Sequence, residues 1–269
     1  MRLSNLVTRS LLAFLLICIT VGLYALEQPQ NSGYKPKVGQ EGKDVIWVPT
    51  PDELVDKMLE IADVSANDFV IDLGSGDGRT VIAAAKLGAR ALGIEFNPDM
   101  IELSKKNAEE AGVSGKTEFI QADFFECDLS EATVITMFLL PSVNLELRPR
   151  LLDLKPGTRI VSNTFSMSDW EPDYEATTSD WVPDYEATTE EDWNSWTTAL
   201  LWVVPAKVEG TWKLQEGGLT IRQEFQMLYG TYKSENKTTN INNGKLNGDG
   251  ITFSIDVEEY TGRLNGGKT

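Results

Sequence analysis

The 269-residue sequence predicts an α/β fold with a doubly wound, mostly parallel sheet, followed by a small antiparallel β module. Three observations predict this architecture. Apolar runs that end in acidic residues alternate with helical patterns, a glycine-rich turn follows the first such run, and the hydrophobic period changes to two after residue 209. Hydrophobic residues make up 41% of the chain, which is enough for one sizeable core and a small module.

The first strand is expected at residues 69–73, where Asp72 is the one polar residue. Such a run is typical of a central parallel strand that helices cover on both faces. Three glycines spaced two apart follow it, and they permit positive φ and a close backbone approach to a ligand. The G-x-G-x-x-G dinucleotide motif requires glycine where Arg79 stands, so NAD is disfavoured. The three glycines are Gly74, Gly76 and Gly78.

Two further strands also end in acidic residues. The strand at 89–96 carries Glu95, which lies 21 residues after Gly74, where an acid can accept hydrogen bonds from ribose hydroxyls. The strand at 117–123 ends in Asp123. Because ligands of open parallel sheets bind beyond the carboxyl ends of the strands, we expect all three acids to meet at one site.

The remaining elements continue the alternation. Strands are expected at 132–141 and 157–165, with a helical segment between them, and a closing strand at 197–208. Upstream, an apolar stripe over 52–62 predicts a helix that packs on the sheet, with Thr50 and Glu53 as a capping box and Pro51 at N1.

The D-x-G-x-G-x-G spacing resembles motif I of the class I S-adenosylmethionine (SAM) methyltransferases, which have a Rossmann-like fold. Further segments are similar to one subgroup, the membrane-anchored protein-lysine methyltransferases and their bacterial relatives, over about residues 45–208. Mitochondrial members of that subgroup modify lysines of the ATP synthase rotor-ring protein and of the adenine nucleotide carrier. The matching segments are V-P-T-P, D-L-G-S-G-D-G-R, G-I-E, L-L-P and G-T-R-I-V-S.

The resemblance implies SAM as cofactor and methyl transfer by in-line displacement to an amine nitrogen such as that of a protein lysine. It implies an adenine site in which Asp123 binds the exocyclic amine and Phe124 contacts the ring. A small-molecule methyltransferase and a non-catalytic binding or scaffold protein are the alternatives. The implied cofactor-binding residues are Asp72, Gly74, Ser75, Gly76, Gly78, Glu95, Asp123 and Phe124.

The segment after the fourth strand bears on the methyl acceptor. Phe138-Leu-Leu-Pro141 replaces the N-P-P-Y or D-P-P-Y element with which amide and nucleobase methyltransferases hold a planar nitrogen, so those substrates are disfavoured. Leu139, Leu140 and Pro141 are candidates for lining a channel for an aliphatic amine, or they pack at the strand end. The chain has no histidine, which excludes histidine bases and histidine metal sites, and we expect no metal.

The net charge of −17, with no basic patch, disfavours nucleic acid as a partner. The acidic surface either attracts a cationic protein or maintains solubility. We therefore expect a protein substrate, while the sequence leaves the oligomeric state open.

The N-terminus carries an uncharged run from Leu11 to Ala25. Its length fits a signal peptide better than a full membrane span, but its cleavage site is imperfect, so residues 1–25 are a signal peptide or an anchor. The chain is accordingly expected to be membrane-anchored or exported to the periplasm, with the side of the membrane open. Residues 26–44 are expected to be a linker and 45–208 the catalytic domain.

A tandem duplication interrupts the predicted domain at residues 168–189, where ten of eleven positions match between 168–178 and 179–189. The inserted copy either lengthens a surface loop or forms an aromatic lid or cation-binding wall. From residue 209 to 269, alternating patterns and Gly or Asn turns predict a β-meander. Such a module is marginal alone, so docking on the first domain is one expectation and truncation the other.

Overall fold

The computed structural model describes residues 33–178, 196–214 and 216–264. The fold belongs to one compact unit, Pro36–Thr269. The predicted signal or anchor and the second copy of the duplication lie outside the described residues, so those expectations stay predictions. In the part of the chain that the structure describes, every helix is too short or too polar to span a membrane.

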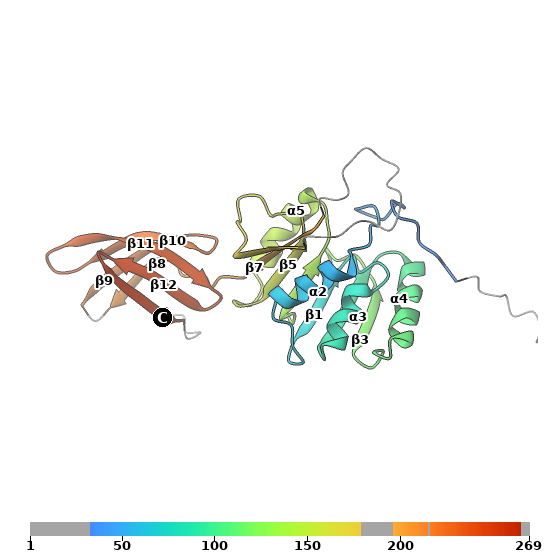
Figure 1. The fold of residues 1–269 in the computed structure, drawn as a ribbon. Helices are drawn as coiled ribbons and strands as arrows, with labels where there is room; N and C mark the ends of the chain where they lie inside the picture. Colours follow the sequence, from blue (N-terminus) through green and yellow to red (C-terminus); the bar gives the residue numbers. More distant parts are fainter. Residues whose placement is uncertain (1–32, 179–195, 215, 265–269) are drawn as a thin grey trace, which may run out of the picture. The chain divides into compact units, whose positions relative to one another are not determined.

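The first sheet has seven strands in the order β3-β2-β1-β4-β5-β7-β6 (Figure 1). β1 to β5 are parallel, while β7 runs antiparallel to both β5 and β6. This order confirms the predicted doubly wound, mostly parallel sheet. The strands are β1 Phe69–Leu73, β2 Arg90–Glu95, β3 Thr117–Gln121, β4 Val134–Met137, β5 Arg159–Asn163, β6 Tyr174–Thr177 and β7 Thr198–Val203.

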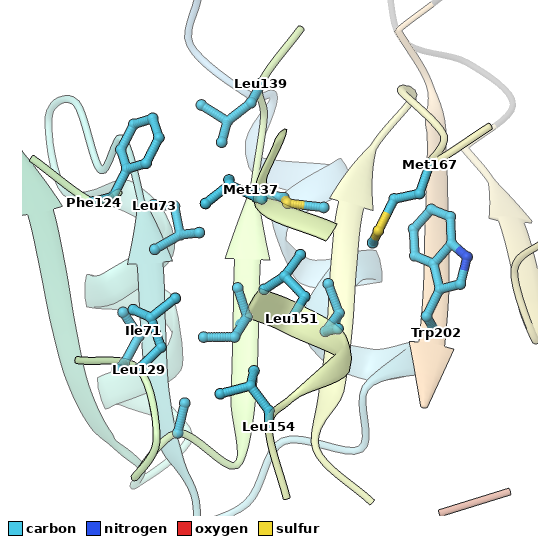
Figure 2. Packing of buried hydrophobic residues seen from close by; sticks show 14 of the residues in the cluster. Ile71, Leu73, Phe124, Leu129, Met137, Leu139, Leu151, Leu154, Met167 and Trp202 are labelled. Atoms are coloured by element: carbon cyan, nitrogen blue, oxygen red, sulfur yellow. The ribbon is translucent and has the colours of Figure 1, made fainter. Parts of the chain in front are cut away.

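Helices cover both faces of this sheet, as the apolar strands require. One buried cluster joins α2, α3 and α4 to one face through residues such as Leu54, Val81 and Ile101. The other cluster joins α5 and the loops to the opposite face through Leu147, Leu151 and the strand residues that Figure 2 shows. The helices are α2 Asp52–Ile61, α3 Arg79–Lys86, α4 Pro98–Glu110 and α5 Pro141–Leu152.

The predicted capping box at the start of α2 is wrong. The N-cap is Pro51, and no side chain caps the helix. Thr50 lies one residue too early for that role, and its hydroxyl oxygen instead accepts a hydrogen bond from Asn163 Nδ2 at 3.3 Å. The cap predicted for α4 is present, because Asn97 accepts from the backbone N–H of Asp99 and Pro98 opens the helix.

The second sheet is an antiparallel meander in the order β13-β12-β11-β10-β9-β8, as predicted. Its buried face includes Leu219, Leu228 and Leu246. Its strands are β8 Gly210–Leu214, β9 Gly217–Glu224, β10 Met227–Lys233, β11 Thr238–Asn247, β12 Gly250–Ile255 and β13 Glu258–Arg263.

Two details of the meander differ from the sequence prediction. Residues 219–229 form a hairpin rather than one strand, because the chain turns at Phe225, whose φ is +51°. The Asn242-Asn-Gly segment is a register shift inside β11 rather than a turn, with Asn243 at φ +52°. An Asn-Gly pair supplies the same left-handed conformation to a bulge as to a turn, so composition does not separate them.

The first copy of the duplication is part of the folded domain. Trp170 is fully buried, and Tyr174–Thr177 forms the edge strand β6. Phe225 of the second sheet stacks on Trp170, with ring centroids 6.0 Å apart. Trp170 is therefore a core residue rather than part of an aromatic lid. The two expectations for the β module, docking on the first domain and truncation, stay predictions.

Candidate functional site

A pocket lies beyond the carboxyl ends of β1 to β4 and is covered by residues 36–50, which we call the strap. The strap folds on itself, since the N–H of Gly39 donates to Trp47 O and the N–H of Trp47 donates to Gln40 O, both at 2.9 Å. The predicted acids and most of the glycine-rich turn share this pocket. Its lining includes Gln40, Lys43, Trp47, Thr50, Asp72, Gly74, Ser75, Gly76, Asp77, Arg79, Glu95, Phe96, Asp123, Phe124 and Phe138.

The glycine-rich turn is held open toward the pocket. Gly74, Gly76 and Gly78 all have positive φ, at +75°, +54° and +81°. Residues with a Cβ adopt this conformation rarely, so the three glycines are required by the backbone. α4 fixes the turn from below, because Ser104 Oγ donates to Gly76 O at 2.8 Å and Asn107 Nδ2 donates to Asp77 O at 2.9 Å.

Glycine is also required sterically at two of these positions. A Cβ on Gly78 would lie 2.9 Å from atoms of both Ser104 and Phe119, and one on Gly76 would lie 2.6 Å from Trp47 Nε1. The turn therefore packs directly against α4 and β3 on one side and the strap on the other. Its backbone is positioned for close approach of a ligand to the space between them.

The Glu95 carboxylate accepts three hydrogen bonds, all from backbone N–H groups. Oε2 accepts from the backbone N–H of Gly76, and Oε1 accepts from the N–H groups of both Phe96 and Asn97, all at 2.9 Å. These bonds fix the orientation of the carboxylate, and each oxygen retains lone pairs for a ligand donor. This geometry fits the predicted contact with ribose hydroxyls.

Asp72 is buried at the end of β1, and its Oδ1 accepts a 2.6 Å hydrogen bond from Thr136 Oγ1 of β4. Burial raises the pKa of this carboxyl to about 7; the Thr136 bond opposes that shift, and the charges of Glu95 and Asp77 add to it. Near neutral pH both the protonated and the ionised form of this side chain are therefore populated. A cation placed in the pocket would favour its ionised form.

Asp123 is engaged by the strap. Its Oδ1 accepts from the N–H of Phe125, and its Oδ2 accepts from Lys43 Nζ, which lowers the pKa of the carboxyl. Lys43 Nζ also lies 5.4 Å from the centroid of the Phe96 ring. Lys43 thus contacts both a carboxylate and an exposed aromatic ring, the two kinds of group that the resemblance predicts for the adenine site.

Phe124, the aromatic residue predicted to contact adenine, is much more buried than Phe96, a second aromatic residue of the pocket. Phe124 lines the pocket but is only 8% exposed and belongs to the core, where Figure 2 shows it above Leu73. Phe96 also lines the pocket and is 50% exposed, so its ring has more surface free for a ligand. Phe96 directly follows Glu95, the residue predicted to bind the ribose, and the sequence prediction did not use this position.

Arg79 ties the turn to the strap. Its guanidinium donates to the Asp77 carboxylate through Nε and Nη2, at 3.0 and 2.7 Å, and through Nη1 to Thr50 O at 2.8 Å. Arg79, which stands where the dinucleotide motif requires glycine, therefore connects the turn to the end of the strap. Residues 40–44, which the sequence assigned to the linker, line the pocket.

The three residues predicted to line an acceptor channel, Leu139, Leu140 and Pro141, lie in different environments. Leu139 is 1% exposed and lies in the core, 3.4 Å from the position of a Cβ on Gly74, which matches the packing alternative. Leu140 and Pro141 are exposed at the start of α5. Phe138, one residue before them, lines the pocket instead.

We expect the Glu95→Ala substitution to weaken SAM binding by about 1.5–3 kcal/mol, the usual scale for hydrogen bonds to a charged group. Calorimetric titration measures the change, with Glu118→Ala on the exposed surface of β3 as the matched control. A folded Glu95→Ala chain that binds SAM as tightly as the wild type would refute the ribose assignment.

The raised pKa of Asp72 predicts a pH-dependent cost. Between about pH 4 and pH 7 the folded chain keeps a proton that the unfolded chain has lost, so the free energy of unfolding falls as pH rises through this window. Asp72→Asn removes this loss and should make the ligand-free chain more stable than the wild type by up to ~4 kcal/mol at pH 8. Urea unfolding of both chains from pH 4 to pH 8 measures it, and a difference that stays constant with pH would contradict the assignment.

We expect Lys43→Met to strengthen SAM binding by up to about fivefold, because the adenine amine then no longer shares Asp123 with an ammonium group, and exposed ion pairs are weak. Titration at low and at high salt provides the check, since salt should reduce the difference. Weaker binding by the variant would instead make Lys43 a ligand contact.

Comparison with known proteins agrees with this site. The family model of the ANTKMT methyltransferase domain matches residues 72–174. A protein-lysine N-methyltransferase of Saccharolobus islandicus is 50% identical over 131 residues, which are 48% of this chain and 81% of that protein. The mouse adenine nucleotide translocase lysine N-methyltransferase is 38% identical over 105 residues, which are 38% of this chain and 46% of that protein.

A solved structure supports both the fold and the cofactor. The crystal structure of an RNA methyltransferase from Salinibacter ruber with S-adenosyl-L-homocysteine is 47% identical, with a TM-score of 0.52. The match covers 60% of this chain and 96% of that chain. The glycine-rich turn, the fixed Glu95 carboxylate and the sheet order fit this cofactor. The chain therefore belongs to the class I SAM-dependent methyltransferases, in the family of the S. islandicus protein-lysine N-methyltransferase.

Proposed function

We propose that this enzyme transfers methyl groups from SAM to lysine side chains of a protein. The observation that carries the proposal is the 50% identity to a protein-lysine N-methyltransferase over most of that relative's length. The more distant mouse relative, whose name also specifies lysine N-methylation, adds support. The pocket supports SAM as the methyl donor, because its carboxylates and its glycine-rich turn suit this cofactor.

The reaction makes modest demands on the protein. Bound SAM supplies an electrophilic methyl group. The neutral amine nitrogen of the acceptor forms the new N–C bond, the S–C bond breaks with its electrons remaining on sulfur, and the methylated nitrogen releases a proton to water. The protein's task is to align the nitrogen and exclude water from the reacting atoms. The strap, with Trp47 against the glycine-rich turn, covers the pocket accordingly.

A second candidate is RNA methylation, which the name of the S. ruber structure favours. Phosphate backbones are bound chiefly by lysine and arginine, whereas this chain has 24 basic and 41 acidic residues. In the pocket, Lys43 pairs with Asp123 and Arg79 with Asp77. Charge therefore favours a protein acceptor over RNA.

One labelling experiment distinguishes the acceptors. The full chain is incubated with tritiated SAM and an extract of cells that lack its gene, and samples are then treated with protease or with ribonuclease. We expect protease to release the label, acid hydrolysis to recover it as methylated lysine, and Glu95→Ala to label at a reduced rate. Label released by ribonuclease would establish RNA as the acceptor, and label confined to acid-soluble molecules would establish a small molecule.

A further inference from the structure

Three aromatic side chains meet at the carboxyl ends of β4 and β5 and the start of β7. The ring centroids of Phe138 and Trp196 are 5.3 Å apart, and the two ring planes are nearly perpendicular, at 77°. The Phe165 ring is 5.9 Å from Phe138 and 6.3 Å from Trp196. All three side chains are partly exposed and lie outside the buried clusters of the described residues. We call this group the aromatic corner.

The backbone at the corner is strained. Thr164 has φ +58°, and the N–H of Phe165 donates back to Asn163 O at 2.6 Å, which makes a rare positive-φ γ-turn. A β-branched residue in this region is an outlier that persists only where its surroundings enforce it, and such strain concentrates at functional sites. The turn departs from the line of β5 and places Phe165 beside Phe138.

Hydrogen bonds hold the strained turn in place. The carbonyl of Phe165 accepts from Ser162 Oγ at 2.8 Å and from Asn144 Nδ2 at 3.0 Å, and the N–H of Thr164 donates to Thr198 O at 2.7 Å. The neighbouring Asn163 is fully buried, and its Oδ1 has no hydrogen-bond partner among the described residues. The backbone that carries the Phe165 ring is therefore fixed by three hydrogen bonds in a conformation that packing alone does not require.

Sheet order places the corner next to the reacting atoms. The residues predicted to hold adenine follow β3 and the residue predicted to hold the ribose ends β2, so SAM bound in the order β3-β2-β1-β4 would have its sulfonium end near β1 and β4. Phe138 directly follows β4 and lines the pocket. The corner, between β4, β5 and β7, is therefore the next surface beyond the methyl group.

We infer that the aromatic corner receives the aliphatic ammonium side chain of the acceptor lysine, an inference that rests on the proposed function. Aromatic faces attract ammonium groups and also pack against methylenes, so three rings suit both parts of a lysine side chain. The corner aligns the amine with the methyl group, and the nitrogen loses its proton to water before transfer. Phe138, Phe165 and Trp196 are thus assigned as acceptor-specificity residues.

The test compares two small probes, Nα-acetyl-lysine methylamide and its norleucine analogue, which lacks the ammonium group. Each is titrated into the full chain saturated with S-adenosylhomocysteine, and binding is followed by ligand NMR. We expect the lysine probe to bind more tightly than the norleucine probe. Trp196→Leu and Phe165→Leu should each reduce lysine-probe binding by about tenfold while leaving S-adenosylhomocysteine affinity unchanged.

Two control variants and one substitute variant keep the result interpretable. Trp196→Phe keeps an aromatic face and should retain most of the affinity, and Tyr229→Leu removes an exposed ring from the second sheet and should change nothing. Phe138→Leu replaces Phe165→Leu if the strained turn does not tolerate leucine; because Phe138 also lines the cofactor pocket, lysine-probe binding by this variant is measured at saturating S-adenosylhomocysteine and compared with that of the norleucine probe. Equal binding of the two probes, or full lysine-probe binding by the leucine variants, would overturn the inference. Failure of the proposed function would appear separately, as label in RNA or small molecules.

Discussion

The site depends on one carboxylate that is bound by three backbone N–H groups. Glu95 ends β2, and its oxygens accept from Gly76 in the turn after β1 and from Phe96 and Asn97 at the start of α4. This single side chain therefore connects two βα units at the edge where the ligand binds. The Glu95 carboxylate holds the glycine-rich turn in place through the N–H of Gly76. The side chain predicted to bind the ribose therefore also stabilises the local fold.

Several other groups at the same edge of the sheet are energetically unfavourable. Asp72 is buried with one hydroxyl partner, three glycines have positive φ, and Thr164 is strained at the end of β5. Apolar packing on both faces of the sheet offsets these costs. The core thus fixes the strand ends rigidly enough for unfavourable groups to be held where the cofactor and the acceptor meet.

The sequence predicted the features that follow from period and spacing. Strands that end in Asp72, Glu95 and Asp123 require no tertiary information, because parallel strands bring their carboxyl ends to one edge. The strap was missed, since residues 36–50 have no helical or strand period and Trp47 and Lys43 act through contacts distant in sequence. The turn at Phe225 was missed because Phe is not a turn residue; stacking on Trp170 accompanies its positive φ. Likewise, only the structure separates Phe138, which lines the pocket, from the buried Leu139.

Three strand ends with carboxylates and a glycine-rich turn with Arg79 in place of the dinucleotide glycine should together select SAM over NAD. Calorimetric titration of the full chain with SAM and, separately, with NAD tests this selectivity most directly. We expect micromolar binding of SAM and no heat from NAD. Binding of NAD, or a folded chain that binds no SAM, would contradict it.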